Sequence, residues 1–330
     1  MRDFAFAKAD GLDAALTTLG RDGTWQVLAG GTTMVDLMKL NVAKPDGLVD
    51  ITSVGGLDGI AIDSGAIRLG ALARMSDVGD HDELANVCPA LTESLWLAAS
   101  PQLRHAARLA GNILQRTRCP YFRDTDYACN KREAGSGCAA LDGGHAAMHA
   151  VLGGSDDCVA MYPGDWGQAL IAFDADVEVR SKNATRRIPF AEFHTQPGTT
   201  PDVETTLKPG EIITEIRVPR SPAMAASTYL KARDRASYAF ASASAAVGLA
   251  MDGDTVTDAR IALGGVASVP WRAREAEDAL KGKPFSEEAA RDAGRIAFRD
   301  AKPVKQSAYK IPLGQSVVAG ALVAARKRAS

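Results

Sequence analysis

The stretch VLAGGTTMVDLMKL, residues 27–40, joins an apolar run to a helical pattern through two glycines. The run WQVLA, residues 25–29, predicts a buried strand, and apolar residues recur at helical spacing over 34–40. Glycines at such a junction let backbone N–H groups approach an anion, to which a helix N-terminus adds positive potential. An ordinary strand–helix turn is the simpler interpretation, because the stretch is neither the spaced G-x-G-x-x-G fingerprint nor a P-loop.

Strand and helix patterns continue on both sides of this junction. A helix is expected over 12–19 and a strand over 47–52, so the first 55 residues alternate helix, strand, helix, strand. The elements expected further along are short strands within 55–72, one helix over about 83–99, a helix and then a strand within 165–181, and a strand over 210–219.

The stretch RSPAMAAS, residues 220–227, predicts the main domain boundary near residue 222, because it interrupts the pattern with Pro, Ser and Ala. Three strand patterns and then three helical patterns follow it. The chain is therefore expected to have an α+β fold, with two α/β layers followed by a sheet backed by helices.

The composition is that of an ordinary globular protein, with 46% hydrophobic and 24% charged residues. Its 38 Lys and Arg and 40 Asp and Glu are mixed along the chain, which argues against nucleic-acid binding and a polybasic membrane anchor. The apolar-looking stretch 237–251 is mostly Ala and Ser and is shorter than a membrane span, so no membrane insertion is expected. The N-terminus has no apolar segment of the kind found in export signals.

Four of the five cysteines, Cys119, Cys129, Cys138 and Cys158, fall in a segment that is polar and rich in Gly and Arg. Without an export signal, such a group is more typical of a metal site than of disulfides, although four separate buried thiols remain an alternative. Zinc is a further alternative, but structural zinc sites usually carry closely paired cysteines and no C-x-x-C motif is present. Cys88 stands alone and is expected to be a buried thiol.

Six motifs occur in a fixed order along nearly the whole chain: VLAGGTTMVDLMKL with LVDIT, IRLGALARMSDV, ASPQLRHAARLAGNI, LKPGEIITEIRVP, YLKARDRASYAFA and IALGGVASVPWRAREAEDAL. This order resembles the FAD-binding (medium) subunit of the molybdenum hydroxylase family, which includes xanthine dehydrogenase and aldehyde oxidoreductases. The resemblance implies a PCMH-type, vanillyl-alcohol-oxidase-like FAD-binding domain over 1–222, with subdomains of about 1–55 and 56–222. It implies a CO dehydrogenase flavoprotein C-terminal-like domain, an antiparallel sheet with helices, over 223–330.

The chain departs from most family members in a longer segment, about residues 114–163, which holds the four clustered cysteines. Its strings RTRCPYF, CNKR and GSGCAAL resemble the flavin subunits of bacterial, often periplasmic, molybdenum aldehyde oxidoreductases that carry an additional [4Fe–4S] cluster. The resemblance implies that these four cysteines bind such a cluster, for which four thiolates are the usual ligand set.

The resemblance also implies a non-covalently bound FAD, because no His is placed for covalent attachment. Arg108 stands where the family usually has Thr, so it either pairs with a phosphate or marks the loss of a hydroxyl contact; Gly164 replaces a family Ser. The residues expected to contact FAD, with Ile212 near the flavin ring, are Gln26, Val27, Leu28, Ala29, Gly30, Gly31, Thr32, Thr33, Met34, Arg108, Gly111, Asn112, Asp165, Ile212 and Lys231.

The implied activity is that of an electron-transfer subunit in a heterotrimeric aldehyde oxidoreductase. A large subunit would carry the molybdenum cofactor and oxidise the aldehyde, and a small subunit with two [2Fe–2S] clusters would pass electrons to the FAD on this chain and then to an external acceptor. A self-sufficient FAD oxidoreductase and a zinc-stapled scaffold subunit remain alternatives. The expected location is cytoplasmic, or periplasmic if a signal-bearing partner exports the complex.

Overall fold

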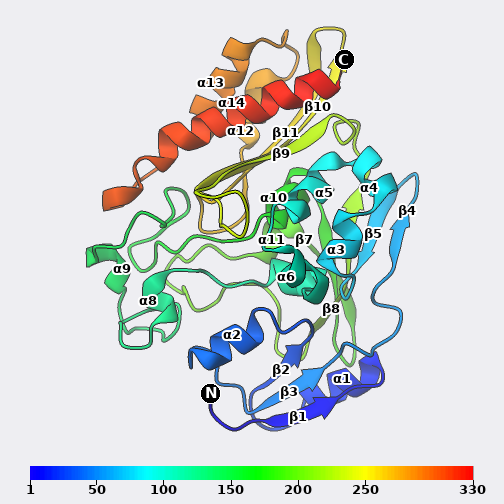
Figure 1. Ribbon diagram of the computed structural model, residues 1–330, viewed down its shortest axis with the longest axis vertical. Coiled ribbons are helices and arrows are strands. Elements are labelled where there is room, and N and C mark those ends of the chain that lie inside the picture. The colour runs from blue at the N-terminus through cyan, green and yellow to red at the C-terminus, as the bar shows by residue number, and fades with distance from the viewer. Residues whose placement is uncertain (330) are drawn as a thin grey trace.

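The computed structural model describes residues 1–329, and Ser330, the last residue of the expected C-terminal domain, lies outside them. Three sheets follow one another along the chain. In Figure 1 the N-terminal sheet lies at the bottom, a five-stranded sheet above it, and the C-terminal sheet at the top beneath the long last helix.

The N-terminal sheet is parallel and has the order β1 (Ala5–Lys8), β3 (Gly47–Asp50), β2 (Trp25–Leu28). Helix α1 (Leu12–Leu19) connects β1 to β2, and α2 (Met34–Lys39) follows β2. Strand β1 precedes the four elements predicted here and was missed. Three of its four residues are exposed, so it carries no apolar alternation that a sequence pattern would reveal.

The five-stranded sheet is antiparallel and packs against helices that form the largest core of the protein. Its strands, in spatial order, are β4 (Ile60–Ile62), β5 (Ala66–Gly70), β8 (Ile212–Pro219), β6 (Asp176–Arg180) and β7 (Thr185–Pro189). The helices of this part are α3 (Met75–Gly79), α4 (Asp82–Val87), α5 (Pro89–Trp96), α6 (Pro101–Ala106), α7 (Leu109–Ile113), α10 (Trp166–Ala172) and α11 (Phe190–Phe193).

The single helix predicted over about 83–99 is wrong, because the structure divides it into α4 and α5. Pro89 begins α5 and has no N–H to continue the hydrogen bonding of α4. Cys88 lies between the two helices, fully buried, with its Sγ 3.7 Å from Ser227 Oγ. Burial raises the pKa of Cys88 to about 12, so the expectation of a buried thiol is confirmed.

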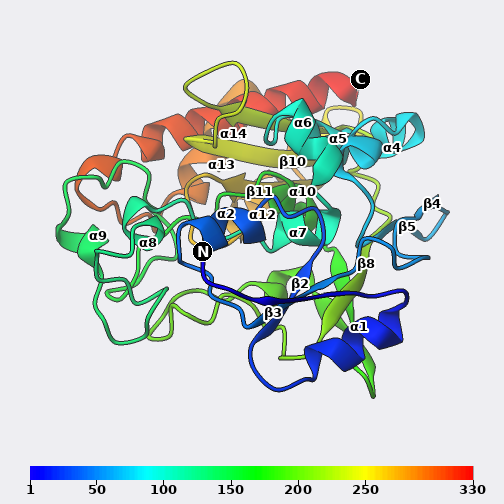
Figure 2. The same ribbon diagram turned by 60° about the horizontal axis from the view of Figure 1, so that its bottom comes forward.

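The cysteine-bearing segment, residues 114–163, contains only two short helices, α8 (Pro120–Arg123) and α9 (Ala139–Asp142), joined by loops. In both views it lies on the side of the molecule where α2 and the start of the last helix also lie (Figures 1 and 2). A small buried cluster of its own, which includes Tyr121 and Phe122, organises the segment.

The C-terminal sheet is antiparallel with the order β12 (Trp271–Arg272), β11 (Thr255–Gly264), β10 (Ala243–Asp252), β9 (Ser227–Ala232). On its outer side lie α12 (Arg274–Leu280), α13 (Glu287–Ala297) and α14 (Lys310–Arg328), with the short 3-10 helix η1 (Lys305–Ser307) leading into α14. Helices α5 and α10 contact strands of the same sheet. Because helices cover both faces of the sheet, β10 has room mainly for small residues such as Ala, Ser and Gly. At Gly248, for example, a Cβ would stand 2.5 Å from the Ala223 carbonyl oxygen.

One helical segment among residues 1–329, Lys305–Arg328, is long and apolar enough to cross a membrane by length and composition alone. In the structure α14 packs against β9, β10 and α13, and Val317, Val318 and Leu322 belong to the buried core of the C-terminal domain. The absence of membrane insertion stays a prediction.

A buried ion pair fastens α12 to the C-terminal sheet. Glu277, 2% exposed, accepts hydrogen bonds from Arg272 and from the backbone N–H of Ile261, the latter at 2.8 Å. We expect Glu277→Ala to lower the free energy of unfolding by at least about 2 kcal/mol, because it removes a buried partner of both groups. Urea unfolding measures this loss.

The matched control is Glu275→Ala in the same helix, which removes an exposed pair with Arg299. Its cost should stay below about 1 kcal/mol. Equal losses in the two variants would contradict the assignment of the buried pair as the stabilising contact.

Candidate functional site

A cleft of about 660 Å³ lies where the N-terminal junction, α7, the cysteine-bearing segment and the C-terminal domain meet. This volume is typical of small-molecule sites, which span roughly 300–1,000 Å³. Five of the residues expected to contact FAD line it: Thr32, Thr33, Gly111, Asn112 and Asp165. The C-terminal domain contributes Tyr309 and Lys310 together with the loop residues Asp234, Arg235, Tyr238, Ala239, Phe240, Ala241 and Ser242.

The glycine pair is required by the packing of the strand–helix turn. A Cβ on Gly30 would overlap the carbonyl oxygen of Ala106 at the end of α6, and Gly31 has a φ of +72°, which glycine adopts readily. The turn is therefore held directly against α6. This contact fixes the position of Thr32 and Thr33 at the cleft.

Gly111 and Asn112 leave both space and hydrogen-bonding capacity on the opposite part of the cleft. No atom lies within 4 Å of a Cβ built on Gly111. Asn112 donates through Nδ2 to Met75 Sδ at 3.4 Å, but its buried Oδ1 has no hydrogen-bond partner among the described residues. An orphaned buried acceptor costs about 1–3 kcal/mol. A ligand with N–H or O–H donors would satisfy it, and the flavin ring and ribityl chain of FAD carry both.

Asp165 forms a buried network at the cleft wall. It occupies the N-cap position of α10, but its side chain does not cap the helix. Instead Oδ1 accepts from the Tyr229 hydroxyl at 2.6 Å and Oδ2 from Lys231 Nζ at 2.9 Å. The Lys231 side chain is 0% exposed and also donates to the Leu97 carbonyl oxygen at 2.9 Å. Burial raises the pKa of Asp165, and the Lys231 ammonium opposes that rise.

The remaining expected FAD contacts are not among the residues that line the cleft, although Gly30, Gly31, Met34 and Lys231 adjoin or contact residues that do. Ile212 is buried in the core of the N-terminal sheet, where Leu57 and Leu72 also lie. Arg108 donates through Nη1 to the Leu72 carbonyl oxygen at 3.2 Å, and its buried Nε has no partner among residues 1–329. The residues that precede the turn in and beside β2 are not among those lining the cleft: Gln26, Val27, Leu28 and Ala29.

Sequence reasoning missed an ion-pair cluster that attaches the cysteine-bearing segment to α2. Asp36 Oδ2 accepts from Arg118 Nη1 and Arg123 Nη1, and Asp36 Oδ1 accepts from Arg123 Nη2, all at 2.9 Å. Hydrogen bonding to Arg123 and the nearby positive charges lower the pKa of Asp36. The guanidinium of Arg118 also stacks 5.1 Å above the ring of Phe240. The partners are too distant in sequence for a local pattern to pair them.

The four clustered cysteines come together in one small core. Cys119, Cys129 and Cys158 are buried, and the half-buried Cys138 packs against them and faces Cys129 across a short antiparallel bridge. Cys119 Sγ lies 3.3 Å from His149 Nε2, a neighbour that the sequence analysis did not single out. Burial raises the pKa of Cys119 to about 12 and that of Cys158 to about 11.

No three or more His, Cys, Asp or Glu side chains within the described part of the chain are arranged to hold a single metal ion. A structural zinc site closes four ligands around one ion, with Zn–S distances of about 2.3 Å. In a [4Fe–4S] cluster each cysteine binds a different iron, so the thiolates stand further apart. Binding of such a cluster stays a prediction.

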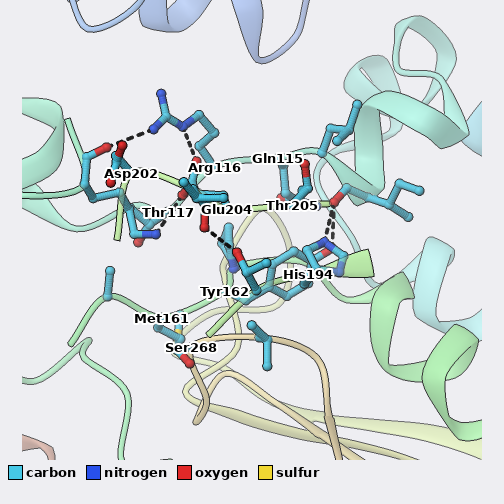
Figure 3. Close-up of a pocket in the computed structure, with 18 of the residues that line it drawn as sticks. Gln115, Arg116, Thr117, Met161, Tyr162, His194, Asp202, Glu204, Thr205 and Ser268 are labelled. Carbon is cyan, nitrogen blue, oxygen red and sulfur yellow. Dashed lines mark hydrogen bonds and ion pairs between the residues drawn. The ribbon is translucent and has the colours of Figure 1, made fainter. Parts of the chain in front are cut away.

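A second cavity, of about 420 Å³, adjoins the cleft and shares Gln115 and Met161 with its walls (Figure 3). On one side Glu204 forms an ion pair with Lys131 Nζ at 2.9 Å and another with Arg116. On the other, His194 Nε2 donates to the Ile113 carbonyl oxygen at 2.8 Å, and burial lowers the pKa of His194 to about 4. The cations of this cavity are thus already paired.

Comparison with known proteins agrees with this geometry. Residues 2–221 match the family described as the FAD binding domain in molybdopterin dehydrogenase, and residues 227–324 match the CO dehydrogenase flavoprotein C-terminal domain. The chain belongs to the FAD-binding subunits of the molybdenum hydroxylase family. This FAD-binding subunit is therefore part of an oxidoreductase, and the two-domain α+β fold expected from its sequence is confirmed.

Individual relatives span the whole subunit. It is 40% identical over 331 residues to the aldehyde oxidoreductase FAD-binding subunit PaoB of Escherichia coli (strain K12), covering 100% of both chains. It is 28% identical over 320 residues to the carbon monoxide dehydrogenase medium chain of Hydrogenophaga pseudoflava, covering 96% of this chain and 93% of that one. A solved structure of carbon monoxide dehydrogenase from Hydrogenophaga pseudoflava superposes with a TM-score of 0.78 at 27% identity, covering 100% and 99% of the two chains.

Substitutions at Gly111 and Gly30 should distinguish an effect on cofactor binding from an effect on folding. Gly111→Ala should leave the free energy of unfolding within about 0.5 kcal/mol of the wild type, because its Cβ enters open space. The same methyl should weaken FAD binding by about tenfold, or about 1.4 kcal/mol, if FAD fills that space. Fluorescence titration of the apoprotein with FAD measures the affinity.

The comparison variant is Gly30→Ala, whose Cβ would overlap the Ala106 carbonyl oxygen. It should lower the free energy of unfolding by about 1–3 kcal/mol even without FAD. Unchanged FAD affinity in Gly111→Ala would mean that the cofactor does not fill this part of the cleft.

The buried imidazole of His194 should make the subunit sensitive to acid. Because its folded pKa is about 4 against an ordinary 6.5, the unfolded chain binds a proton between these values that the native chain does not. The free energy of unfolding should therefore fall as pH drops from 6.5 to 4, by up to about 1.4 kcal/mol per pH unit from this group. His194→Gln should reduce that slope in denaturant unfolding, whereas His105→Gln, at an exposed position, should keep it.

Proposed function

We propose that this chain is the FAD- and [4Fe–4S]-binding electron-transfer subunit of a molybdenum-dependent aldehyde oxidoreductase. Electrons reach its FAD from [2Fe–2S] clusters of a partner subunit and leave to an external acceptor. The observation that carries this proposal is the convergence of four cysteines into one core beside the cleft of an FAD-binding subunit. The aldehyde assignment is supported by the 40% identity, over the whole chain, to a relative named as an aldehyde oxidoreductase subunit.

The chain's own residues supply a non-covalent FAD site. The turn at Gly30 and Gly31 lets backbone N–H groups approach the pyrophosphate, and Asn112 Oδ1 accepts from a cofactor donor. The Asp165–Lys231 pair immobilises the wall between the two domains. Bound FAD supplies the ability to take up two electrons and to release them singly or together. The protein's part is to bind this group, orient it and set its potential.

The cysteine core offers four thiols, the usual ligand set of a [4Fe–4S] cluster. Its four thiols share one small core without closing on a single-ion site among the described residues. Burial raises the pKa of Cys119 and of Cys158, so metal binding at these two thiols must displace protons. The ammonium of Lys131 opposes the rise in the pKa of Cys158, so its positive charge can stabilise the thiolate that forms there.

The partners follow from the same proposal. A large subunit holds the molybdenum cofactor and carries out aldehyde oxidation, and a small subunit holds two [2Fe–2S] clusters, giving a heterotrimer. The family relatives named as medium chains support a multi-subunit complex. The complex is cytoplasmic, or periplasmic by export with a signal-bearing partner. The purified single chain should show no aldehyde turnover, and turnover would favour a self-sufficient FAD oxidoreductase instead.

Metal and cofactor content tests the proposal. Anaerobically purified chain should contain one FAD with about four iron and four sulfide, as expected for one [4Fe–4S] cluster. Cys158→Ser should lose the iron and sulfide but keep FAD, because the cysteine core and the FAD cleft use different side chains. Visible spectra with iron, sulfide, zinc and flavin analysis measure these contents.

The matched control is Cys88→Ser, at a buried cysteine that does not belong to the cysteine core. This variant should keep the wild-type iron content. Wild-type chain with FAD but no iron would contradict the cluster and leave an FAD subunit. Zinc in place of both would favour the scaffold alternative.

A further inference from the structure

Lys310 is a buried cation on the wall of the flavin cleft. It is the first residue of α14, is 1% exposed, and lines the cleft with Asp165, Met161 and Ser242. Its Nζ donates to the carbonyl oxygen of Gly265 at 2.6 Å and lies 3.4 Å from both the Met148 carbonyl oxygen and Met161 Sδ. The side chain therefore joins α14 to the C-terminal sheet and the cysteine-bearing segment.

Lys310 forms no direct ion pair within residues 1–329, and the carboxylate of Asp234, which lines the same cleft, acts on it only through space. All three of its partners are uncharged, and no carboxylate in residues 1–329 forms an ion pair with Nζ. Burial lowers the pKa of Lys310 to about 8. The other buried lysine at the site, Lys231, differs in being paired with Asp165. Burying an ammonium without a directly paired carboxylate is costly, and negative charge on a ligand in the cleft would offset that cost.

The position of Lys310 indicates which part of FAD it faces. The pyrophosphate belongs at the glycine turn with Thr32 and Thr33, on the N-terminal side of the cleft. The C-terminal domain forms a wall of the cleft and contributes Lys310 to it at the start of α14. Figure 1 shows α2 and the start of α14 in different layers of the molecule. A cofactor that spans the cleft from the turn directs its ring toward this C-terminal wall.

We propose that Lys310 faces the flavin ring and stabilises the negative charge that the ring acquires on reduction, raising its reduction potential. The inference rests on FAD occupying this cleft. Two-electron reduction brings two electrons from the partner's iron–sulfur clusters and one proton from water to the ring. The proton bonds to N5, and one negative charge remains over N1 and the C2 oxygen. A nearby ammonium lowers the free energy of this anion more than that of the neutral oxidised ring.

The test compares variants of the full chain loaded with FAD. Lys310→Met removes the charge at similar length, and Lys310→Gln removes it while keeping a donor for the Gly265 carbonyl oxygen, which guards against a folding defect. Lys310→Arg keeps the charge, and Lys302→Met is the matched control at an exposed lysine. FAD content is measured first from flavin absorbance, and the potential then by anaerobic reductive titration with a reference dye.

Lys310→Met and Lys310→Gln should retain FAD but shift the two-electron reduction equilibrium at least tenfold toward the oxidised flavin, a potential about 30 mV lower. Lys310→Arg should lie within about threefold of the wild type in that equilibrium, and Lys302→Met should match it. An unchanged potential in both neutral variants with FAD retained would overturn the inference and make Lys310 a structural tether only. An equal shift in Lys310→Arg would overturn it too, since charge would not be the cause.

Failure of the underlying FAD site has a different signature. If Gly111→Ala binds FAD normally while neutral Lys310 variants keep the wild-type potential, the cofactor does not occupy this cleft and both statements fall. If Gly111→Ala weakens binding and the potential stays unchanged in the neutral variants, only the role of Lys310 falls.

Discussion

The cleft depends on one buried ion pair between two domains. Asp165 comes from α10 of the FAD-binding domain, and Lys231 comes from β9 of the C-terminal domain. Their contact at 2.9 Å, completed by the Tyr229 hydroxyl, joins the two domains beside the site. Removing one member of such a pair strands a buried charge and typically costs about 3–5 kcal/mol. This contact helps to hold the loop that contains Phe240 and the start of α14 against the FAD-binding domain.

Local motifs contain several of the residues that line the cleft. Thr32, Thr33, Gly111 and Asn112 sit in local motifs whose backbone geometry is determined within a few residues. Asp165 and Lys231 were both expected only from the resemblance to the family. Only the fold reveals that each is the partner of the other. Much of the α+β layout was readable for the same local reason, because strands such as β8 and helices such as α13 carry strong apolar patterns.

The misses have physical causes of another kind. Strand β1 is too short and exposed to show alternation, and Pro89 divides a helix within an apolar pattern that continues across it. Asp36 and its two arginines, the contact of Cys119 with His149, and the cleft position of Lys310 all depend on residues brought together from distant parts of the chain. No local spacing encodes such contacts, so the sequence pattern does not pair these side chains.

The small residues of the C-terminal sheet have a consequence for the site that lies beyond them. A side chain on Gly248 would press on the Ala223 backbone and the ring of Phe173, and one on Gly264 would overlap Gln168 of α10. The sheet can approach the FAD-binding domain this closely because these two positions have no side chain. Enlarging either residue would move the C-terminal wall outward as a unit. The width of the cleft therefore depends on two glycines that do not line it.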